Sequence, residues 1–138
     1  MRKSLYMNIL VPIDGSKYSE KALLHACYMA RNYHSKLIIL YVVDKSFPIN
    51  MLDRKEYLGI LRKFGNKVLN DGKRVTTRLG VDSKTVIKEG NVANEIVTFA
   101  KTEQCNLIIV GNRGLGAITR FFLGSISNKL ANDLLVLF

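Results

Sequence analysis

The hydrophobic pattern of the chain consists of short apolar stretches that alternate with longer amphipathic segments. Four of these stretches, at residues 7–13, 37–43, 85–88 and 107–110, are rich in valine, isoleucine or leucine. Short and nearly continuous apolar runs are typical of strands that are covered on both faces. We therefore predict a buried strand at each of the four.

The segments between the predicted strands have the spacing of helices. Apolar residues recur every three or four positions in segments that run from residue 17 to about residue 33, over 51–79 and over 92–102, as they do on one face of a helix. Ser16 has the side chain of a good N-cap for the first helix. Gly80 follows the second helix, where it suits a C-cap.

Two glycines interrupt the second helical pattern. Gly65 and Gly72 both belong to its apolar repeat, and each costs a helix interior roughly 1 kcal/mol relative to alanine. We expect a kink or close packing against a neighbouring element at these positions.

Alternating strands and helices predict the fold class. The pattern favours a single α/β domain over residues 1–138, with a doubly wound, five-stranded and mainly parallel sheet and helices on both faces. In such sheets ligands bind at the carboxyl ends of the strands, near the point where the strand order reverses. Residues 14–16, 42–44 and 111–114 all lie at the carboxyl ends of predicted strands, and we expect them to meet at that edge.

The loop that follows residues 107–110 is rich in glycine. It has the pattern Gly111-x2-Gly114-x9-Gly124-Ser125. A loop of this kind that opens a helix presents backbone N–H groups to anions such as phosphate. The sequence contains neither Gly-x4-Gly-Lys-Ser/Thr nor a complete Gly-x-Gly-x-x-Gly, so the loop does not match the two familiar phosphate signatures.

The charge balance is strongly basic. The chain has 21 Lys and Arg against 11 Asp and Glu, a net charge of +10, which favours polyanionic partners from nucleotides to nucleic acids and anionic lipids. Residues 51–79 hold eight of the basic and three of the acidic residues. A solvated helix face explains this better than a nucleic-acid site, because basic and aromatic residues are not interleaved. We do not expect nucleic acid as a partner.

Cysteine usage and the N-terminus bear on the compartment. Cys27 and Cys105 belong to no metal or redox motif, so we interpret them as buried free thiols. Near the N-terminus, Asn8 interrupts the apolar stretch and residues 12–16 read PIDGS where a signal peptide would have a small-residue cleavage site. No apolar run is long enough to span a bilayer. We expect a cytoplasmic protein without membrane association.

Four motifs in one order resemble the universal stress protein family. They are VPIDGS at residues 11–16, YVVD at 41–44, IKEGN at 87–91 and the glycine pattern at 111–125. The resemblance covers nearly the whole chain, and the full glycine pattern is typical of the family's ATP-binding branch. It implies a Rossmann-like fold of the adenine nucleotide alpha hydrolase type, with ATP, ADP or AMP as the ligand.

The resemblance also implies individual contacts. Pro12, Asp14 and Val42 would line the adenosine pocket, with Val42 acting largely through its backbone. An Asp before Gly-Ser is also a common turn residue, so both roles stay open for Asp14. Arg113 is the best candidate for a charged phosphate contact. The other residues expected to bind the nucleotide are Val110, Gly111, Arg113, Gly114, Gly124, Ser125, Ile126 and Ser127.

Glycine has a physical reason at these loop positions. A Cβ at Gly111, Gly114 or Gly124 would block the close approach of phosphates or disfavour a positive φ. Loop turns alone would explain isolated glycines. The N-terminal dipole of a helix that begins at Ser125 and Ser127 would favour an anion at the same place.

The sequence points to regulation rather than catalysis. It contains no evident general base for water attack and no Asp/Glu cluster for a metal, so any Mg²⁺ would be held chiefly by phosphate oxygens and water. We predict a regulatory protein whose nucleotide acts as a switch, with slow or no hydrolysis. The alternative is a dimeric interaction module that binds no nucleotide, as in the family's other branch, where the glycine pattern is usually lost.

The C-terminal segment departs from the family pattern, because the last helix is short and no proline precedes Asp133. Residues 134–138 are entirely apolar. We predict a strand there, although the spacing of Ile126, Leu130 and Leu134 also fits one continuous helix. An apolar edge strand exposes unpaired backbone groups. We therefore expect a homodimer joined through this segment.

Overall fold

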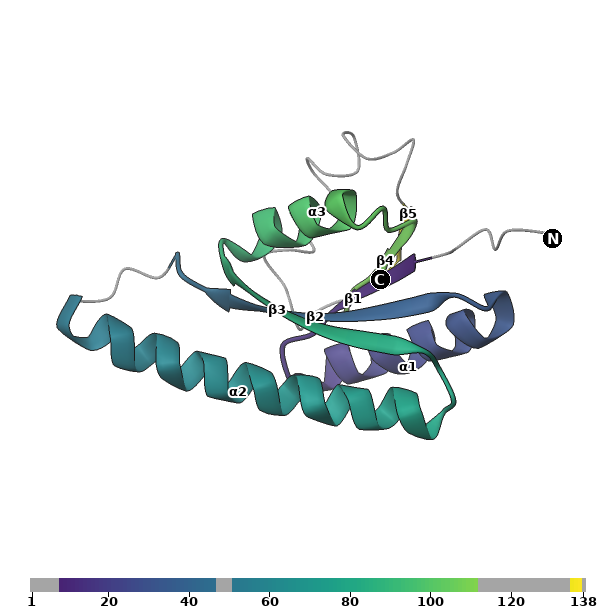
Figure 1. Ribbon diagram of the computed structural model, residues 1–138, viewed down its shortest axis with the longest axis horizontal. Helices are drawn as coiled ribbons and strands as arrows, with labels where there is room; N and C mark the ends of the chain where they lie inside the picture. Colours follow the sequence, from purple (N-terminus) through teal and green to yellow (C-terminus); the bar gives the residue numbers. More distant parts are fainter. Residues whose placement is uncertain (1–7, 47–50, 112–134, 138) are drawn as a thin grey trace.

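The computed structural model describes residues 8–46, 51–111 and 135–137 (Figure 1). Strands and helices alternate through these ranges, as the sequence predicts. The elements are β1 (Asn8–Pro12), α1 (Lys17–Tyr33), β2 (Lys36–Asp44), α2 (Met51–Arg78), β3 (Ser83–Gly90), α3 (Val92–Thr102), β4 (Leu107–Ile109) and β5 (Leu135–Leu137).

The strands form one parallel sheet in the order β3-β2-β1-β4-β5. The chain runs outward from β1 through β2 to β3 and then returns to β4 on the other side of β1, so the strand order reverses next to β1. Helices α1 and α2 cover one face of the sheet and α3 covers the other (Figure 1). The predicted α/β class, with a parallel sheet and helices on both faces, is confirmed.

The C-terminal segment forms a strand and not the end of a helix. Leu135–Leu137 pair in parallel with β4, and Val136 lies opposite Ile108. The continuous-helix alternative is therefore wrong at these residues, because their backbone groups pair with a neighbouring strand.

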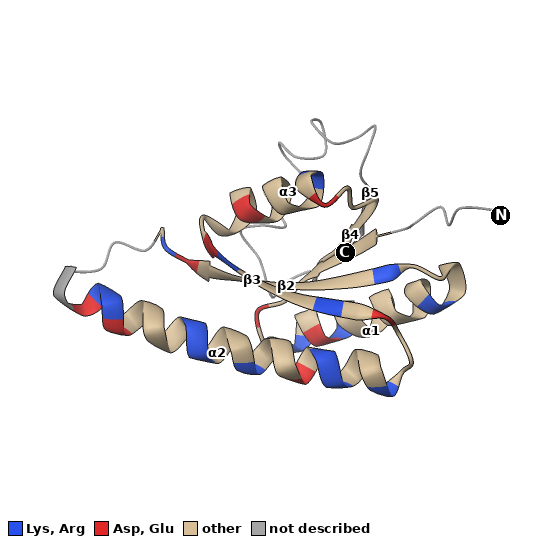
Figure 2. Ribbon diagram, viewed as in Figure 1, with Lys and Arg blue, Asp and Glu red and all other residues tan. Residues whose placement is uncertain are grey.

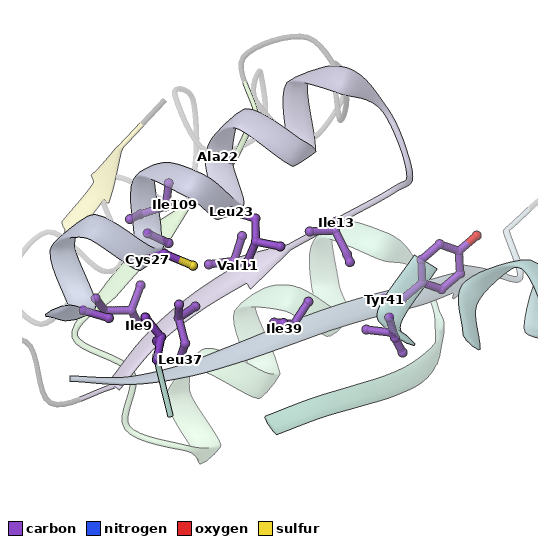
Figure 3. Close-up of a cluster of buried hydrophobic side chains, with 14 of the residues drawn as sticks. Ile9, Val11, Ile13, Ala22, Leu23, Cys27, Leu37, Ile39, Tyr41 and Ile109 are labelled. Atoms are coloured by element: carbon purple, nitrogen blue, oxygen red, sulfur yellow. The ribbon is translucent and has the colours of Figure 1, made fainter. Parts of the chain in front are cut away.

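Two hydrophobic clusters hold the sheet to its helices. Along β1, Ile9 and Val11 belong to the cluster under α1 and α2, whereas Leu10 belongs to the cluster under α3. Figure 3 shows Ile9, Val11, Leu37 and Ile39 from β1 and β2 packed beneath α1. Because both faces are buried, successive strand residues are all apolar, which explains the continuous apolar runs of the sequence.

The predicted capping residues, Ser16 and Gly80, lie at the ends of their helices, and Asn91 is a further cap. The Ser16 side chain accepts a hydrogen bond from the Ser19 N–H at 3.2 Å, and α1 begins at the next residue after Ser16. The Asn91 side chain caps α3 in the same way. Beyond the end of α2, Gly80 has a φ of 72°, which a glycine adopts without the cost that a Cβ brings.

The two glycines of α2 differ in their surroundings. A Cβ at Gly65 would lie 2.4 Å from the Tyr41 Cδ1 atom, whereas a Cβ at Gly72 would be at least 3.4 Å from Leu23, Ile39 and Ile13. The expected close packing is therefore found at Gly65. At Gly72 the neighbouring atoms lie at ordinary contact distance.

Both cysteines are free and buried, as predicted. Burial raises the pKa of the Cys27 thiol, and burial is also the main reason that the pKa of Cys105 is raised to about 11. Such thiols stay protonated and unreactive at neutral pH. Among the described helices, none combines the length and the apolar character needed to cross a bilayer.

Candidate functional site

A cavity of about 180 Å³ opens at the carboxyl ends of β1 and β2, beside the start of α3. Its position, next to the reversal of strand order, is where open α/β sheets bind ligands. The cavity brings together three residues that the sequence predicts for one pocket, Pro12, Asp14 and Val42. Its full lining is Pro12, Ile13, Asp14, Leu40, Tyr41, Val42, Asp44, Val92 and Ile96.

The walls of this cavity are mainly apolar. Val42 is partly buried and packs against the cluster under α3, and Ile96 of α3 belongs to that cluster. Alternation along β2 explains the placement, because Val42 points to the α3 face while its neighbours Tyr41 and Val43 pack on the α1 and α2 face. The Val42 side chain is thus part of the core, as expected, and also lines the cavity.

Two carboxylates give the cavity its polar character, and both hold turns at strand ends. The Asp14 Oδ1 atom accepts a hydrogen bond from the Ser16 N–H at 2.9 Å. The Asp44 Oδ1 atom accepts one from the Ser46 N–H at 2.9 Å and another from the Ser46 hydroxyl. The turn role that the sequence left open for Asp14 is therefore present. Within the described ranges, the Oδ2 atom of each carboxylate has no hydrogen-bond partner.

The sequence placed Asp44 at this edge of the sheet but did not predict it as a binding residue. It occupies at the end of β2 the position that Asp14 occupies just after β1, and each is followed two residues later by a serine. This repeated Asp-x-Ser was the available sign. The two Asp-x-Ser turns lie side by side at the edge of the sheet, because β1 and β2 are neighbouring strands.

Gly111 has a packing role that differs from the one expected. A Cβ at this position would lie 2.6 Å from the Tyr18 carbonyl carbon and 2.9 Å from the Ser19 nitrogen. Among the described glycines, only Gly15, Gly80 and Gly90 have a positive φ. The requirement for glycine at 111 therefore comes from the backbone of the first turn of α1, which packs closely against the residue that follows Val110.

Val110 is the other predicted loop residue within the described ranges. It is buried in the cluster under α3, so its side chain supports the core. The other members lie outside the described residues. They are Arg113, Gly114, Gly124, Ser125, Ile126 and Ser127.

A charged cluster lies at the end of β3. Glu89 accepts two hydrogen bonds from Arg62 of α2 and forms an ion pair with Lys45 at 3.2 Å. Hydrogen bonding from Arg62 is the main cause that lowers the pKa of Glu89 to about 2, with a smaller effect of Lys45. The Lys45 N–H also donates to the Gly90 carbonyl at 3.0 Å. This cluster joins α2 to the carboxyl ends of β2 and β3, next to Asp44 in the sequence and to its strand partner Gly90.

The described residues contain no group of three His, Cys, Asp or Glu side chains that could hold a metal ion. A cation in the cavity would meet at most the carboxylates of Asp14 and Asp44. The donor set of the described site therefore suits hydroxyl or amino groups of a ligand better than a resident metal.

The fold and the site together define a class, an open parallel α/β domain with a ligand cleft at its topological switch point. The sequence profile of the universal stress protein family matches residues 5–134. The chain belongs to this family.

Known relatives agree with this assignment. Universal stress protein YxiE of Bacillus subtilis is 32% identical over 139 aligned positions, which cover 92% of this chain and 93% of the relative. A crystal structure of a family protein from Burkholderia pseudomallei has a TM-score of 0.81 at 28% identity and covers 98% of this chain and 97% of its own. A crystal structure of a universal stress protein in complex with cAMP has a TM-score of 0.68 at 25% identity, with 98% of this chain and 99% of that chain covered.

Proposed function

We propose that this protein is a cytoplasmic, ATP-binding regulator of the stress response, in which the bound nucleotide acts as a switch and is hydrolysed slowly or not at all. The observation that carries the proposal is the cavity at the strand ends, which gathers Pro12, Asp14 and Val42. Val42 belongs to β2, whereas Pro12 and Asp14 lie at the end of β1, and the three residues meet at this edge of the sheet.

The cavity has the chemistry that a nucleoside needs. Val42, Ile96 and Pro12 provide apolar surface for a base. The Asp14 and Asp44 carboxylates can each accept a hydrogen bond from a ribose hydroxyl through Oδ2 while Oδ1 keeps its turn. At about 180 Å³, the cavity is smaller than the roughly 300 Å³ at which pockets begin to enclose a whole drug-sized ligand. It would therefore hold the base and ribose, and the phosphates would extend outside it.

The phosphates would meet the glycine pattern that begins at Gly111. The backbone N–H groups near Gly114, Gly124 and Ser125 and the Arg113 side chain are the proposed contacts, as in the ATP-binding branch of the family. Mg²⁺, when present, would be held by phosphate oxygens and water. The net charge of +10 favours such an anionic ligand, and the relative solved with cAMP supports an adenine nucleotide.

Slow turnover follows from the roles of the side chains. Asp14 and Asp44 accept backbone hydrogen bonds that shape the strand ends, so we assign them to binding and give no residue a catalytic role. Nucleotide that is positioned without a base or a fixed metal gains little stabilisation in the transition state. Bound ATP would therefore persist, and partner proteins would distinguish the ATP-bound from the nucleotide-free protein.

The proposal is tested on freshly purified protein. Mass spectrometry of the supernatant after denaturation should detect an adenine nucleotide in an amount comparable to the protein. Protein that is purified without nucleotide and also fails to bind added ATP, ADP, AMP or cAMP would support the non-binding interaction module instead.

A further inference from the structure

Strand β3 is one edge of the sheet, and no described strand pairs with its outer side. The Leu37 N–H donates to the Asp82 carbonyl, which sets the direction of the backbone groups along β3. Because these groups alternate along a parallel strand, even-numbered residues bond to β2 and odd-numbered residues face outward. Thr85, Ile87 and Glu89 therefore direct their N–H and C=O groups away from the sheet, and the described residues supply no partner for them.

The first outward carbonyl of the strand is already occupied. The Lys73 Nζ atom of α2 donates a hydrogen bond to the Ser83 carbonyl oxygen. An internal side chain thus satisfies this one group. The outward N–H and C=O groups of Thr85, Ile87 and Glu89 remain without a described partner, and they are enough backbone to pair with a short extended segment.

Two exposed lysines stand at this edge. Lys84 and Lys88 lie on the α3 face of β3. There Lys84 forms a long ion pair with Glu103 at 3.8 Å, and the Lys88 Nζ atom lies 5.9 Å from the centre of the Phe99 ring. On the α2 face, Glu89 is neutralised by Arg62 and Lys45. Figure 2 shows basic residues on β3 and along α2 beneath it, and acidic residues at the ends of β3.

We propose that the β3 edge binds an extended acidic peptide segment, which adds to the sheet as a further strand. Its backbone would pair with Thr85, Ile87 and Glu89. Acidic side chains at alternate positions would face Lys84 and Lys88, because opposite charges across neighbouring strands stabilise the pairing.

The charges argue for this occupant over a second copy of the chain. Two β3 edges that paired with each other would bring four lysines, Lys84 and Lys88 from each copy, to one face of the joined sheet. Like charges in adjacent strands are destabilising, and edge lysines are a known protection against self-association. The same lysines attract a segment of opposite charge.

The geometry sets the partner's length. Lys84 and Lys88 are four residues apart, about 13 Å along a strand that rises roughly 3.3 Å per residue. A segment of about seven residues with acids at every second position spans both lysines and the three outward backbone residues.

The test uses a synthetic octapeptide of alternating threonine and glutamate, labelled for fluorescence anisotropy, with the full-length protein. We expect saturable binding. In amide hydrogen exchange followed by NMR, the peptide should slow the exchange of Thr85, Ile87 and Glu89 at least tenfold. An octapeptide of the same sequence and charge in which every backbone nitrogen is methylated cannot donate along either side, so it should bind at least tenfold more weakly. Equal binding of the two peptides, or no binding, would overturn strand addition.

Protein variants separate charge from backbone pairing. Thr85→Pro removes one outward N–H and leaves the bonds to β2 in place, so it should weaken binding at least tenfold. Lys84→Glu with Lys88→Glu should abolish it. Lys21→Glu with Lys101→Glu makes the same charge change at exposed positions elsewhere and should change affinity less than threefold. Equal losses in the two double variants would show that only net charge matters and would contradict the proposal.

Discussion

Alanine should stabilise the protein at only one of the two glycines of α2. Each substitution gives the helix about 1 kcal/mol of intrinsic propensity. At Gly72 a new Cβ would lie 3.4 to 3.6 Å from Leu23, Ile39 and Ile13, so nothing has to move. Gly72→Ala should therefore stabilise the protein by about 1 kcal/mol.

At Gly65 the same methyl group meets a buried ring. A Cβ there would be 2.4 and 2.6 Å from the Tyr41 Cδ1 and Cε1 atoms, whereas carbon atoms in favourable contact lie about 3.5–4.0 Å apart. The ring is only 7% exposed and stands edge to face with Phe64, so it would have to shift within packed surroundings. Overpacking of this kind costs about 1–3 kcal/mol, which cancels or exceeds the propensity gain.

The two variants should consequently differ by about 1–3 kcal/mol, since the propensity gain is common to both. Urea unfolding followed by circular dichroism measures this as a midpoint separation of about 0.5–1.5 M, for a typical slope near 2 kcal/mol/M. In a Tyr41→Leu background, Gly65→Ala should become as favourable as Gly72→Ala. If Gly65→Ala were as stable as Gly72→Ala in the wild-type background, the reasoning from the Tyr41 contact would be refuted.

Other predictions concern pH, the nucleotide and assembly. The pKa of Glu89 is lowered from 4.5 to about 2 in the folded protein. Its contribution to stability is therefore present above pH 4.5 and is lost as the pH falls toward 2. The difference in free energy of unfolding between wild type and Glu89→Gln, measured in urea, should shrink over this window. Gly124→Val should weaken ATP binding at least tenfold in calorimetry while circular dichroism stays unchanged. Steady-state phosphate release should stay well below the ~1 s⁻¹ of slow typical enzymes, and a rate near that value that Gly124→Val abolishes would count against a regulatory role. Wild type should be a dimer in light scattering, and Leu135→Lys with Leu137→Lys should give monomers that still bind ATP.

The buried parts of the fold could be predicted because both faces of the central strands are covered. Residues 37–43 are continuously apolar and lie within β2, the longest strand. Strand β3 shows where this criterion fails. The apolar pattern indicated only residues 85–88, whereas the strand runs from Ser83 to Gly90. As an edge strand it has one strand neighbour and exposed lysines, so its ends carry no hydrophobic signature.

The candidate site could be predicted only where a local motif marks it. The turn after β1 gave Asp14 and the cap Ser16, because both act within a few residues of each other. The ion pair of Arg62 with Glu89 joins residues that are 27 positions apart, and no spacing rule connects them. The sequence singled out Gly111 as a position that requires glycine. The residues that impose this requirement belong to the backbone of α1, about 90 positions away in the chain, so the loop sequence could not reveal them.

Calorimetry of ATP binding decides whether the cavity at the strand ends is the nucleotide site. It compares wild type with Asp14→Asn under the same conditions. The amide keeps the Oδ1 atom that accepts the Ser16 N–H, and replaces the free Oδ2 acceptor with an NH₂ donor. Asp71→Asn, at an exposed acid of α2 that pairs only with Arg74 among the described residues, makes the same charge change outside the cavity. We predict that Asp14→Asn weakens ATP binding at least tenfold and that Asp71→Asn leaves it within twofold. Unchanged affinity in a folded Asp14→Asn protein, or no ATP binding to wild type, would contradict the proposed function.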